Sequence, residues 1–211
     1  MHVVERLWPG ETVTILATGP SLSQEDVDYV RGKTRVVCVN DSYRLAPWAD
    51  ALYACDPAWW RWHQGVPGFQ GPKWSIESSA WSKRCRESFA DVRRLQNTGE
   101  TGLETKSTGL RTGRNSGYQA VNLAVHYGAS RILLLGYDMQ MVEGRRHFFG
   151  NHPESGHHSP YPSFRQHFAT VVKPLAQAGV TVVNCTPGSA LTCFPTDALR
   201  QALPVSAEVA A

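Results

Sequence analysis

The sequence predicts an α/β fold of the Rossmann-like kind: a single domain with a mostly parallel sheet and helices on both faces. Three observations predict it. Short apolar runs that fit strands alternate with segments that fit helices, and these runs are apolar throughout, as expected where both faces of a strand are buried. The chain has 211 residues and 42% hydrophobic content, enough for one core of ordinary size. We expect residues 1–195 to form the domain and residues 196–211 to form a C-terminal tail.

The domain should begin with a strand followed by a helix. Residues 12–17 are apolar or β-branched, and this run stops at Gly19 and Pro20, where the chain has to turn. A helix over about 23–31 is expected next. Two serines are alternative N-caps for it, and acidic residues in its first turns suit the positive end of a helix.

Two further strands are expected at residues 35–40 and 51–56, because each of these apolar runs ends in a polar residue. Each strand therefore delivers a polar side chain at its carboxyl end. Residues 57–112 mix tryptophan, proline and glycine with a polar stretch. This mixture predicts an irregular insert or lid.

A regular pattern returns with a helix that starts at Asn115 or Ser116, either of which can cap it. Alanine, leucine and tyrosine recur in it at helical spacing. The run 131–136 predicts a fully buried strand. After a histidine-rich stretch, a helix over 161–178 and a strand over 180–184 complete the domain.

Composition excludes several classes of function. The chain has 21 basic and 18 acidic residues, a net charge of +3, which is too balanced for a general nucleic-acid binder. No segment approaches the ~20 apolar residues that a membrane span requires. The five cysteines form no C-x-x-C pair, and an odd number leaves at least one thiol unpaired. We therefore expect a cytoplasmic protein without a membrane span, and a homo-oligomer is compatible with the sequence.

Polar groups gather at the predicted carboxyl edge of the sheet, where parallel sheets bind their ligands. The first group is Thr18, Gly19, Pro20 and Ser21. Gly19 allows a ligand to approach the backbone closely, and the amide of Ser21 can donate to a phosphate. The alternative is a tight strand-to-helix turn, because the sequence lacks both common glycine-rich phosphate-binding motifs.

The other predicted strand ends add Asn40, Asp41, Asp56 and Asp138 to this edge. Asp138 follows the most hydrophobic strand. A carboxylate there either holds Mg²⁺ against a diphosphate or caps a turn.

A second candidate for anion binding is the pair Arg111 and Arg114, which stands just before Asn115, Ser116 and Gly117 at a predicted helix start. A fixed positive charge beside free helix amides suits a phosphate or a carboxylate. A solvated surface arginine is the competing interpretation.

The turn after the last strand is rich in hydroxyl and backbone donors. It comprises Thr186, Pro187, Gly188 and Ser189. It either closes over a nucleobase or ribose, or simply leads into the C-terminal tail.

Five of the eight histidines fall within one short stretch, between His147 and His167. A histidine in a loop near a nucleotide is a candidate general base. Zinc is disfavoured, because no cysteine lies among these histidines and their spacing matches no common zinc site.

Taken together, these motifs resemble the bacterial sialyltransferases of glycosyltransferase family 42. The resemblance runs from about residue 12 to residue 195 and rests on residues 17–22, 40–41, 115–117, 136–138, 157–159 and 185–189. It implies a Rossmann-like fold and a nucleotide donor that contacts Gly19, Ser21, Asn40, Ser116 and Gly117, with the turn at 185–189 over the nucleoside. It also implies that His158 is the base for an acceptor hydroxyl, with His157 as the alternative.

The Gly-Pro-Ser-Leu start, Asp56 and the Gly-x-Asp that ends at Asp138 also look like the 6-hydroxymethylpterin diphosphokinase-like family. That family moves diphosphate from ATP with Mg²⁺. Asp138 and Asp56 would then hold the metal.

The sequence therefore predicts a nucleotide-dependent transferase domain over residues 1–195. The leading hypothesis is a glycosyltransferase with a nucleotide-sugar donor, an unidentified hydroxyl acceptor and a histidine base. The alternatives are a Mg²⁺-dependent diphosphokinase and a non-catalytic nucleotide-binding module. We expect no tightly bound cofactor; Mg²⁺ would arrive with the nucleotide donor, if at all.

Overall fold

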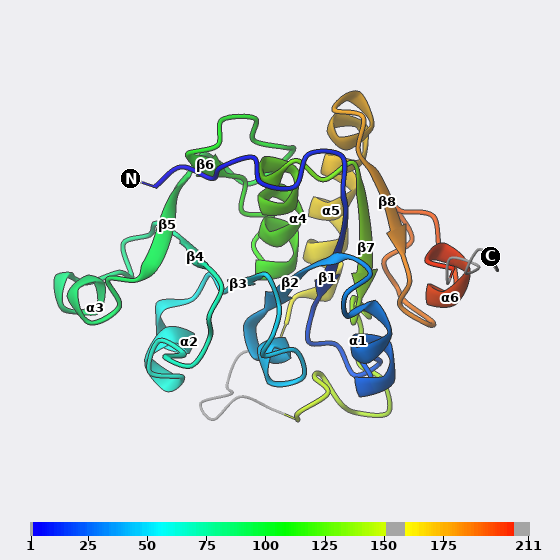
Figure 1. Ribbon diagram of the computed structural model, residues 1–211, viewed down its shortest axis with the longest axis horizontal. Coiled ribbons are helices and arrows are strands. Elements are labelled where there is room, and N and C mark those ends of the chain that lie inside the picture. The colour runs from blue at the N-terminus through cyan, green and yellow to red at the C-terminus, as the bar shows by residue number, and fades with distance from the viewer. Residues whose placement is uncertain (1, 151–158, 205–211) are drawn as a thin grey trace, which may run out of the picture.

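A computed structural model describes residues 2–150 and 159–204. Its centre is one eight-stranded sheet with the strand order β6-β5-β4-β3-β2-β1-β7-β8 (Figure 1). The strands are β1 (Thr12–Leu16), β2 (Arg35–Val39), β3 (Ala51–Tyr53), β4 (Lys73–Ile76), β5 (Val92–Asn97), β6 (Gly109–Leu110), β7 (Arg131–Leu135) and β8 (Thr181–Asn184). Neighbouring strands of this sheet pair in parallel. The predicted α/β, Rossmann-like fold with a parallel sheet is confirmed.

Helices cover both faces of the sheet. They are α1 (Gln24–Val30), α2 (Pro57–Trp62), α3 (Lys83–Ser88), α4 (Ser116–Tyr127), α5 (Tyr161–Gln177) and α6 (Leu199–Ala202), with a 3-10 helix η1 (Asn40–Arg44) after β2. Successive strand residues point to opposite faces. Ile15 therefore packs in the core under α4 and α5, whereas Leu16 packs in the core under α1, α2, α3 and α6.

The helix starts follow the expected capping chemistry. Ser23 is the N-cap of α1, and its side chain accepts a hydrogen bond from the Asp26 amide at 3.1 Å. Asn115 is the N-cap of α4 and accepts from the Tyr118 amide at 2.8 Å. Gly128 ends α4 in the left-handed region, at φ 102°.

Residues 57–112, predicted to be an irregular insert or lid, instead carry two helices and three strands that extend the sheet beyond β3. The hydrophobic pattern did not reveal these strands, because β4 opens with a lysine, β5 contains two arginines and β6 has only two residues. Lys73 opens β4, yet it is buried, because its ammonium group donates to the carbonyls of Gly65 and Val66 and pairs with Asp91. β5, next to the short edge strand β6, has both exposed and buried positions, so its sequence is mixed.

The predicted C-terminal tail is also more ordered than expected over its described part, residues 196–204. Thr196 forms a β-bridge with Asn184 at the edge of the sheet, and α6 buries Leu199 and Ala202. The Tyr29 hydroxyl donates to the Leu203 carbonyl at 2.6 Å. This segment therefore belongs to the core on the α1 side.

The strand order reverses direction at β1. From β1 the chain passes to β2 on one side and, much later, to β7 on the other. The carboxyl ends of β1 and β7 thus flank a topological switch point, which is where open α/β sheets bind their ligands.

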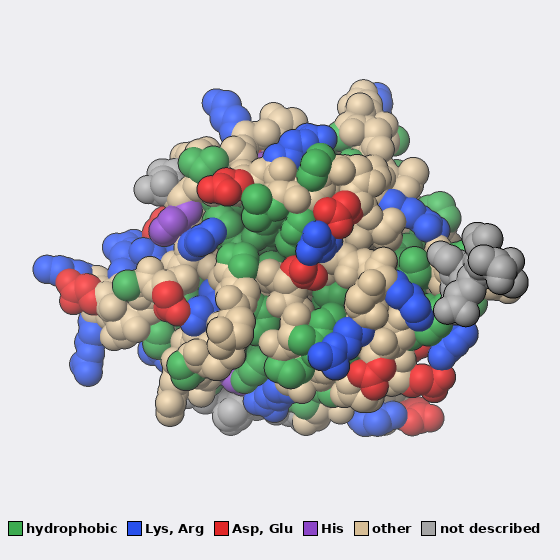
Figure 2. All heavy atoms as spheres, in the orientation of Figure 1, with side chains coloured by type: hydrophobic (Ala, Val, Ile, Leu, Met, Phe, Trp, Pro, Cys, Tyr) green, Lys and Arg blue, Asp and Glu red, His purple; other side chains and the backbone are tan. Residues whose placement is uncertain are grey.

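Two further expectations concern membrane spans and the distribution of charge. Within the described ranges, no helix is both long enough and apolar enough to cross a bilayer. On the face in Figure 2, basic and acidic side chains are interspersed and form no single basic patch.

Candidate functional site

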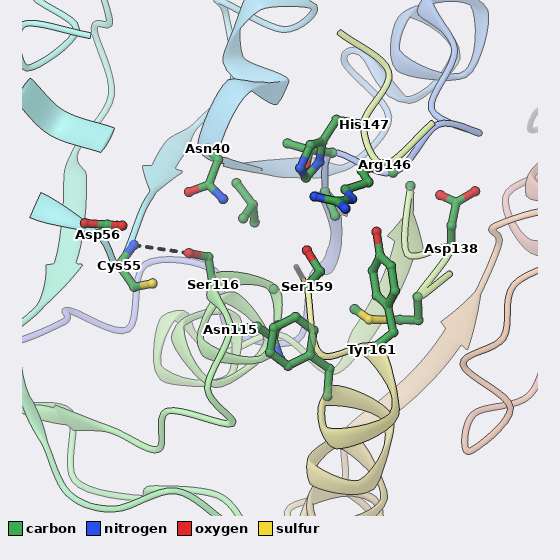
Figure 3. Close-up of a pocket in the computed structure, with 18 of the residues that line it drawn as sticks. Asn40, Cys55, Asp56, Asn115, Ser116, Asp138, Arg146, His147, Ser159 and Tyr161 are labelled. Carbon is green, nitrogen blue, oxygen red and sulfur yellow. Dashed lines mark hydrogen bonds between the residues drawn. The ribbon is translucent and has the colours of Figure 1, made fainter. Parts of the chain in front are cut away.

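A pocket of about 350 Å³ opens at the carboxyl ends of β1 and β7, at the switch point. Its walls come from the segments that follow β1, β2, β3 and β7, from the start of α4 and from the start of α5 (Figure 3). The predicted site residues that line it are Thr18, Gly19, Asn40, Asp56, Arg114, Asn115, Ser116, Gly117 and Asp138. The parallel topology therefore brings together side chains from across the sequence.

The N-terminus of α4 forms one wall. Ser116 and Gly117 line the pocket in the first turn, where backbone amides have no partner within the helix. Ser116 also accepts a hydrogen bond through its hydroxyl from the Cys55 amide at 3.2 Å, which ties the end of β3 to α4. Arg114 adds a positive charge directly before this turn.

Three pocket residues hold backbone conformations that side chains rarely adopt. Asn40, Arg114 and Met139 have φ values of 51°, 58° and 52°. Each follows a different strand or loop, and such strain typically gathers at functional sites, where the surrounding structure imposes it. The three positive φ values therefore support a functional site, where the direction of the side chains is kept at the cost of backbone strain.

Asp138 is held by the turn after β1. Its carboxylate accepts hydrogen bonds from the Ser21 hydroxyl at 2.8 Å and the Ser21 amide at 3.2 Å. Gly19 packs against the same carboxylate, and its amide donates to the Gly136 carbonyl at 2.9 Å. Burial raises the pKa of Asp138, and the two bonds from Ser21 oppose that rise.

The turn after β1 therefore holds the Asp138 carboxylate, whereas it was predicted to bind a phosphate. The Ser21 amide, predicted to bind a phosphate, donates to Asp138 instead. Pro20 and Ser21 lie outside the described lining of the pocket. Gly19 is needed for close approach, but the group that approaches it is a carboxylate of the same chain.

The acidic residues do not fit the predicted magnesium site. Asp56 caps α2, with its Oδ1 accepting from the Ala58 amide at 2.8 Å. Asp138 lies at the opposite end of the pocket from Asp56 (Figure 3) and binds Ser21 through both oxygens. Among the residues described, no group of three or more His, Cys, Asp or Glu side chains could hold a metal ion.

Asp41 points into the core. It is 1% exposed, accepts from the Trp59 indole at 2.8 Å and pairs with Arg44 at 3.0 Å. His63 lies 3.4 Å from the same carboxylate and stacks on Trp59. Asp41 therefore fixes Trp59, whose ring forms part of the pocket wall.

The turn after β8, predicted either to cover a nucleoside or to lead into the C-terminal tail, is not among the described residues that line this pocket. Thr186, Pro187, Gly188 and Ser189 line a separate groove beside Arg200. The Thr186 hydroxyl accepts from the Tyr137 amide at 2.9 Å, and the Ser189 hydroxyl donates to the Tyr137 carbonyl at 2.5 Å. The turn thus braces the segment that carries Asp138.

Several pocket residues escaped the sequence analysis. Arg146 and His147 enter from the segment after β7, and Tyr161 enters from the start of α5. The histidine-rich composition pointed to this part of the chain without selecting His147, and no sequence signal selected Arg146. The predicted bases His157 and His158 lie outside the described residues.

The remaining walls carry aromatic and weakly acidic groups. Trp59, Trp62 and Phe164 present aromatic surfaces. Burial raises the pKa of Tyr161, opposed by a hydrogen bond to Ser159, so its hydroxyl is a neutral donor. Burial likewise raises the pKa of the Cys55 thiol, and the Ser116 hydroxyl opposes that rise, so Cys55 stays protonated at neutral pH.

Fold and pocket together define the class: an α/β protein with a Rossmann-like parallel sheet and a pocket of mixed polar and aromatic lining at its switch point. No protein-family model and no curated protein matches the chain.

Proposed function

We propose that the chain is a nucleotide-dependent transferase that binds a nucleotide-activated sugar in this pocket and moves the sugar to a hydroxyl acceptor. One observation carries the proposal. The pocket lies at the switch point of a parallel sheet, and its wall combines two arginines with the N-terminus of α4.

The cationic side chains favour a phosphorylated ligand. Arg114 stands at the start of α4, where the helix dipole also attracts negative charge. Arg146 enters from another segment of the wall. Guanidinium groups match phosphate oxygens in geometry as well as charge.

The rest of the pocket suits a nucleoside and a sugar. Its volume of about 350 Å³ is within the range of small-molecule sites. Trp59 and Trp62 offer aromatic surfaces for a base or a sugar ring, and Asn40 offers an amide that both donates and accepts. The choice of a sugar as the transferred group rests on the sequence resemblance to glycosyltransferase family 42.

The transfer needs a base and a stabilised leaving group. A histidine takes the proton of the acceptor hydroxyl, and the hydroxyl oxygen attacks the anomeric carbon of the donor sugar. The bond from that carbon to the phosphate oxygen breaks, and the leaving nucleotide keeps the electron pair. Arg114 and Arg146 stabilise its charge. His147 is the described histidine of the pocket wall, and His157 and His158 remain predicted bases.

The diphosphokinase alternative depends on Asp56 and Asp138 as joint magnesium ligands. Asp138 is engaged by Ser21, and Asp56 lies at the far end of the pocket. This arrangement favours the glycosyltransferase proposal, in which arginines and backbone amides contact the phosphate, over a diphosphokinase that holds it through Mg²⁺.

The proposal is tested with a panel of CMP-, UDP- and GDP-activated sugars together with ATP, in which donor hydrolysis and transfer are measured with EDTA and with Mg²⁺. We expect turnover of one donor class in EDTA, and its loss in Arg114→Met. Arg84→Met, an exposed change on α3, is the matched control and should behave as wild type. Nucleotide binding without turnover would indicate a binding module, and Mg²⁺-dependent turnover of ATP alone would indicate the diphosphokinase.

A further inference from the structure

We infer that Arg146 is a phosphate-binding residue of the pocket, and that Thr18 is the positioning residue that holds it there. The inference rests on the proposed function for the identity of the ligand, a phosphorylated nucleotide. It concerns a short hairpin, residues 142–150, that follows β7.

The hairpin has its own backbone hydrogen bonds. Val142 and Arg145 exchange two of them, at 3.1 and 2.9 Å, and the Gly150 amide donates to the His147 carbonyl at 3.2 Å. These antiparallel bridges fix the path of the chain on both sides of Arg146. The direction of the Arg146 side chain therefore depends on where the hairpin is attached.

Thr18 attaches the hairpin at two points. Its carbonyl accepts from the Phe148 amide at 3.0 Å, and its hydroxyl lies 3.0 Å from the Nδ1 of His147. Thr18 is buried and lies two residues beyond the end of β1. It is a rigid base for this contact.

Aromatic contacts secure the outer side of the hairpin. Phe149 stacks on His147, with ring centroids 5.0 Å apart and planes within 3°. The Arg44 guanidinium lies 5.6 Å from the centroid of the Phe149 ring. Stacking and cation–π contacts restrict how far this part of the hairpin can turn.

With the hairpin attached in this way, Arg146 extends over the middle of the pocket. Figure 3 shows its guanidinium beside His147, on the side of Ser159 and Tyr161. Its charge reaches the Tyr161 hydroxyl: burial raises the pKa of Tyr161, whereas the Ser159 hydrogen bond and the positive charge of Arg146 lower it. A phosphate in the pocket would meet Arg146 from the hairpin and the amides of Ser116 and Gly117 from α4.

The test is a set of calorimetric titrations with CMP, UDP, GDP, ATP and inorganic pyrophosphate, with NMR titrations of the matching nucleosides. Arg146→Met should raise the Kd of the tightest-binding nucleotide by about tenfold or more, because charge-assisted bonds to the phosphate are lost. The Kd of the matching nucleoside should not change. Arg145→Met is the matched control, since Arg145 is an exposed neighbour on the same hairpin that pairs with Glu143. It should bind as wild type.

Thr18 is tested by rescue and by a double variant. Thr18→Val should weaken nucleotide binding and leave nucleoside binding unchanged. Thr18→Ser, which keeps the hydroxyl, should bind the nucleotide as wild type does. If Thr18 acts through Arg146, then Thr18→Val combined with Arg146→Met should bind no worse than Arg146→Met alone. Additive losses would instead assign Thr18 a direct contact with the ligand and overturn its positioning role.

The outcomes separate this inference from the proposed function. Nucleotide binding that is unaffected by Arg146→Met, or an equal loss of nucleotide and nucleoside, overturns the role of Arg146 and leaves the proposed function standing. Binding of pyrophosphate through Arg146 without binding of any nucleotide overturns the proposed function and supports the phosphate site. If the wild-type chain binds neither, both fail.

Discussion

Replacing Gly19 with alanine should destabilise the carboxyl edge of the sheet, because the space beside this glycine is filled by Asp138. A Cβ at Gly19 would lie 2.8 Å from the Asp138 Cγ, and closer still to its Oδ2 and to the Gly136 carbonyl oxygen. Backbone and a bonded carboxylate must both move to admit it. Overpacking of this kind costs about 1–3 kcal/mol.

A second loss adds to the overpacking. When the Asp138 carboxylate moves, its bonds from the Ser21 hydroxyl and amide are stretched, and bonds to a charged group contribute roughly 1.5–3 kcal/mol. We expect Gly19→Ala to lower the free energy of unfolding by about 3–5 kcal/mol. For a chain of this size, that corresponds to a fall in Tm of roughly 10 °C.

The assay is urea denaturation followed by circular dichroism, together with a thermal melt. Gly68→Ala is the matched control, because a Cβ at Gly68 meets nothing within 4 Å, and it should behave as wild type. If the free energy of unfolding of Gly19→Ala lies within about 0.5 kcal/mol of the wild-type value, as for ordinary surface substitutions, the packing of Gly19 on Asp138 is refuted.

Three further predictions concern a cap, a buried histidine and a pocket thiol. Asn115→Ala should cost about 1 kcal/mol in urea denaturation, because the Tyr118 amide loses its acceptor; an unchanged midpoint would argue against this cap. Burial lowers the pKa of His126 from 6.5, so the stability that its neutral form contributes is present above pH 6.5 and is lost as the pH falls through the folded-state pKa. His126→Gln should flatten that acid-side loss in a urea series, and an unaltered slope would count against it. Iodoacetamide should alkylate Cys55 slowly, because burial keeps the thiol protonated, and bound nucleotide should slow the reaction further. Mass spectrometry of the Cys55 peptide measures the rate, and a rate equal to that of a free thiol would contradict the prediction.

Much of the fold was readable from local pattern. β1, β2 and β7 consist of apolar or β-branched residues apart from one arginine at the start of β2 and one at the start of β7. Asn115 marks the start of α4 as its N-cap, so the positions of these elements follow from the sequence itself. β4 was not readable, because Lys73 is buried only through carbonyls and a carboxylate that the fold brings to it. A charged residue in a strand looks exposed until its partners are known.

The site divides in the same way. That Thr18, Asn40 and Asp138 share one edge follows from parallel strands alone. Their partners do not follow, because Ser21 and Asp138 are 117 positions apart and their hydrogen bonds exist only in the folded chain. Asp41 turned inward toward Trp59 for a comparable reason. Composition marks candidate residues, whereas tertiary contacts decide which of them face a ligand.

A crystal structure of the chain with the tightest-binding nucleotide of the CMP, UDP, GDP and ATP panel tests the binding site most directly. It should place the phosphate between Arg146 and the first turn of α4, with the nucleoside against the wall that carries Trp59 and Trp62. A nucleotide bound elsewhere on the protein, or an empty pocket in crystals grown with saturating nucleotide, would contradict it.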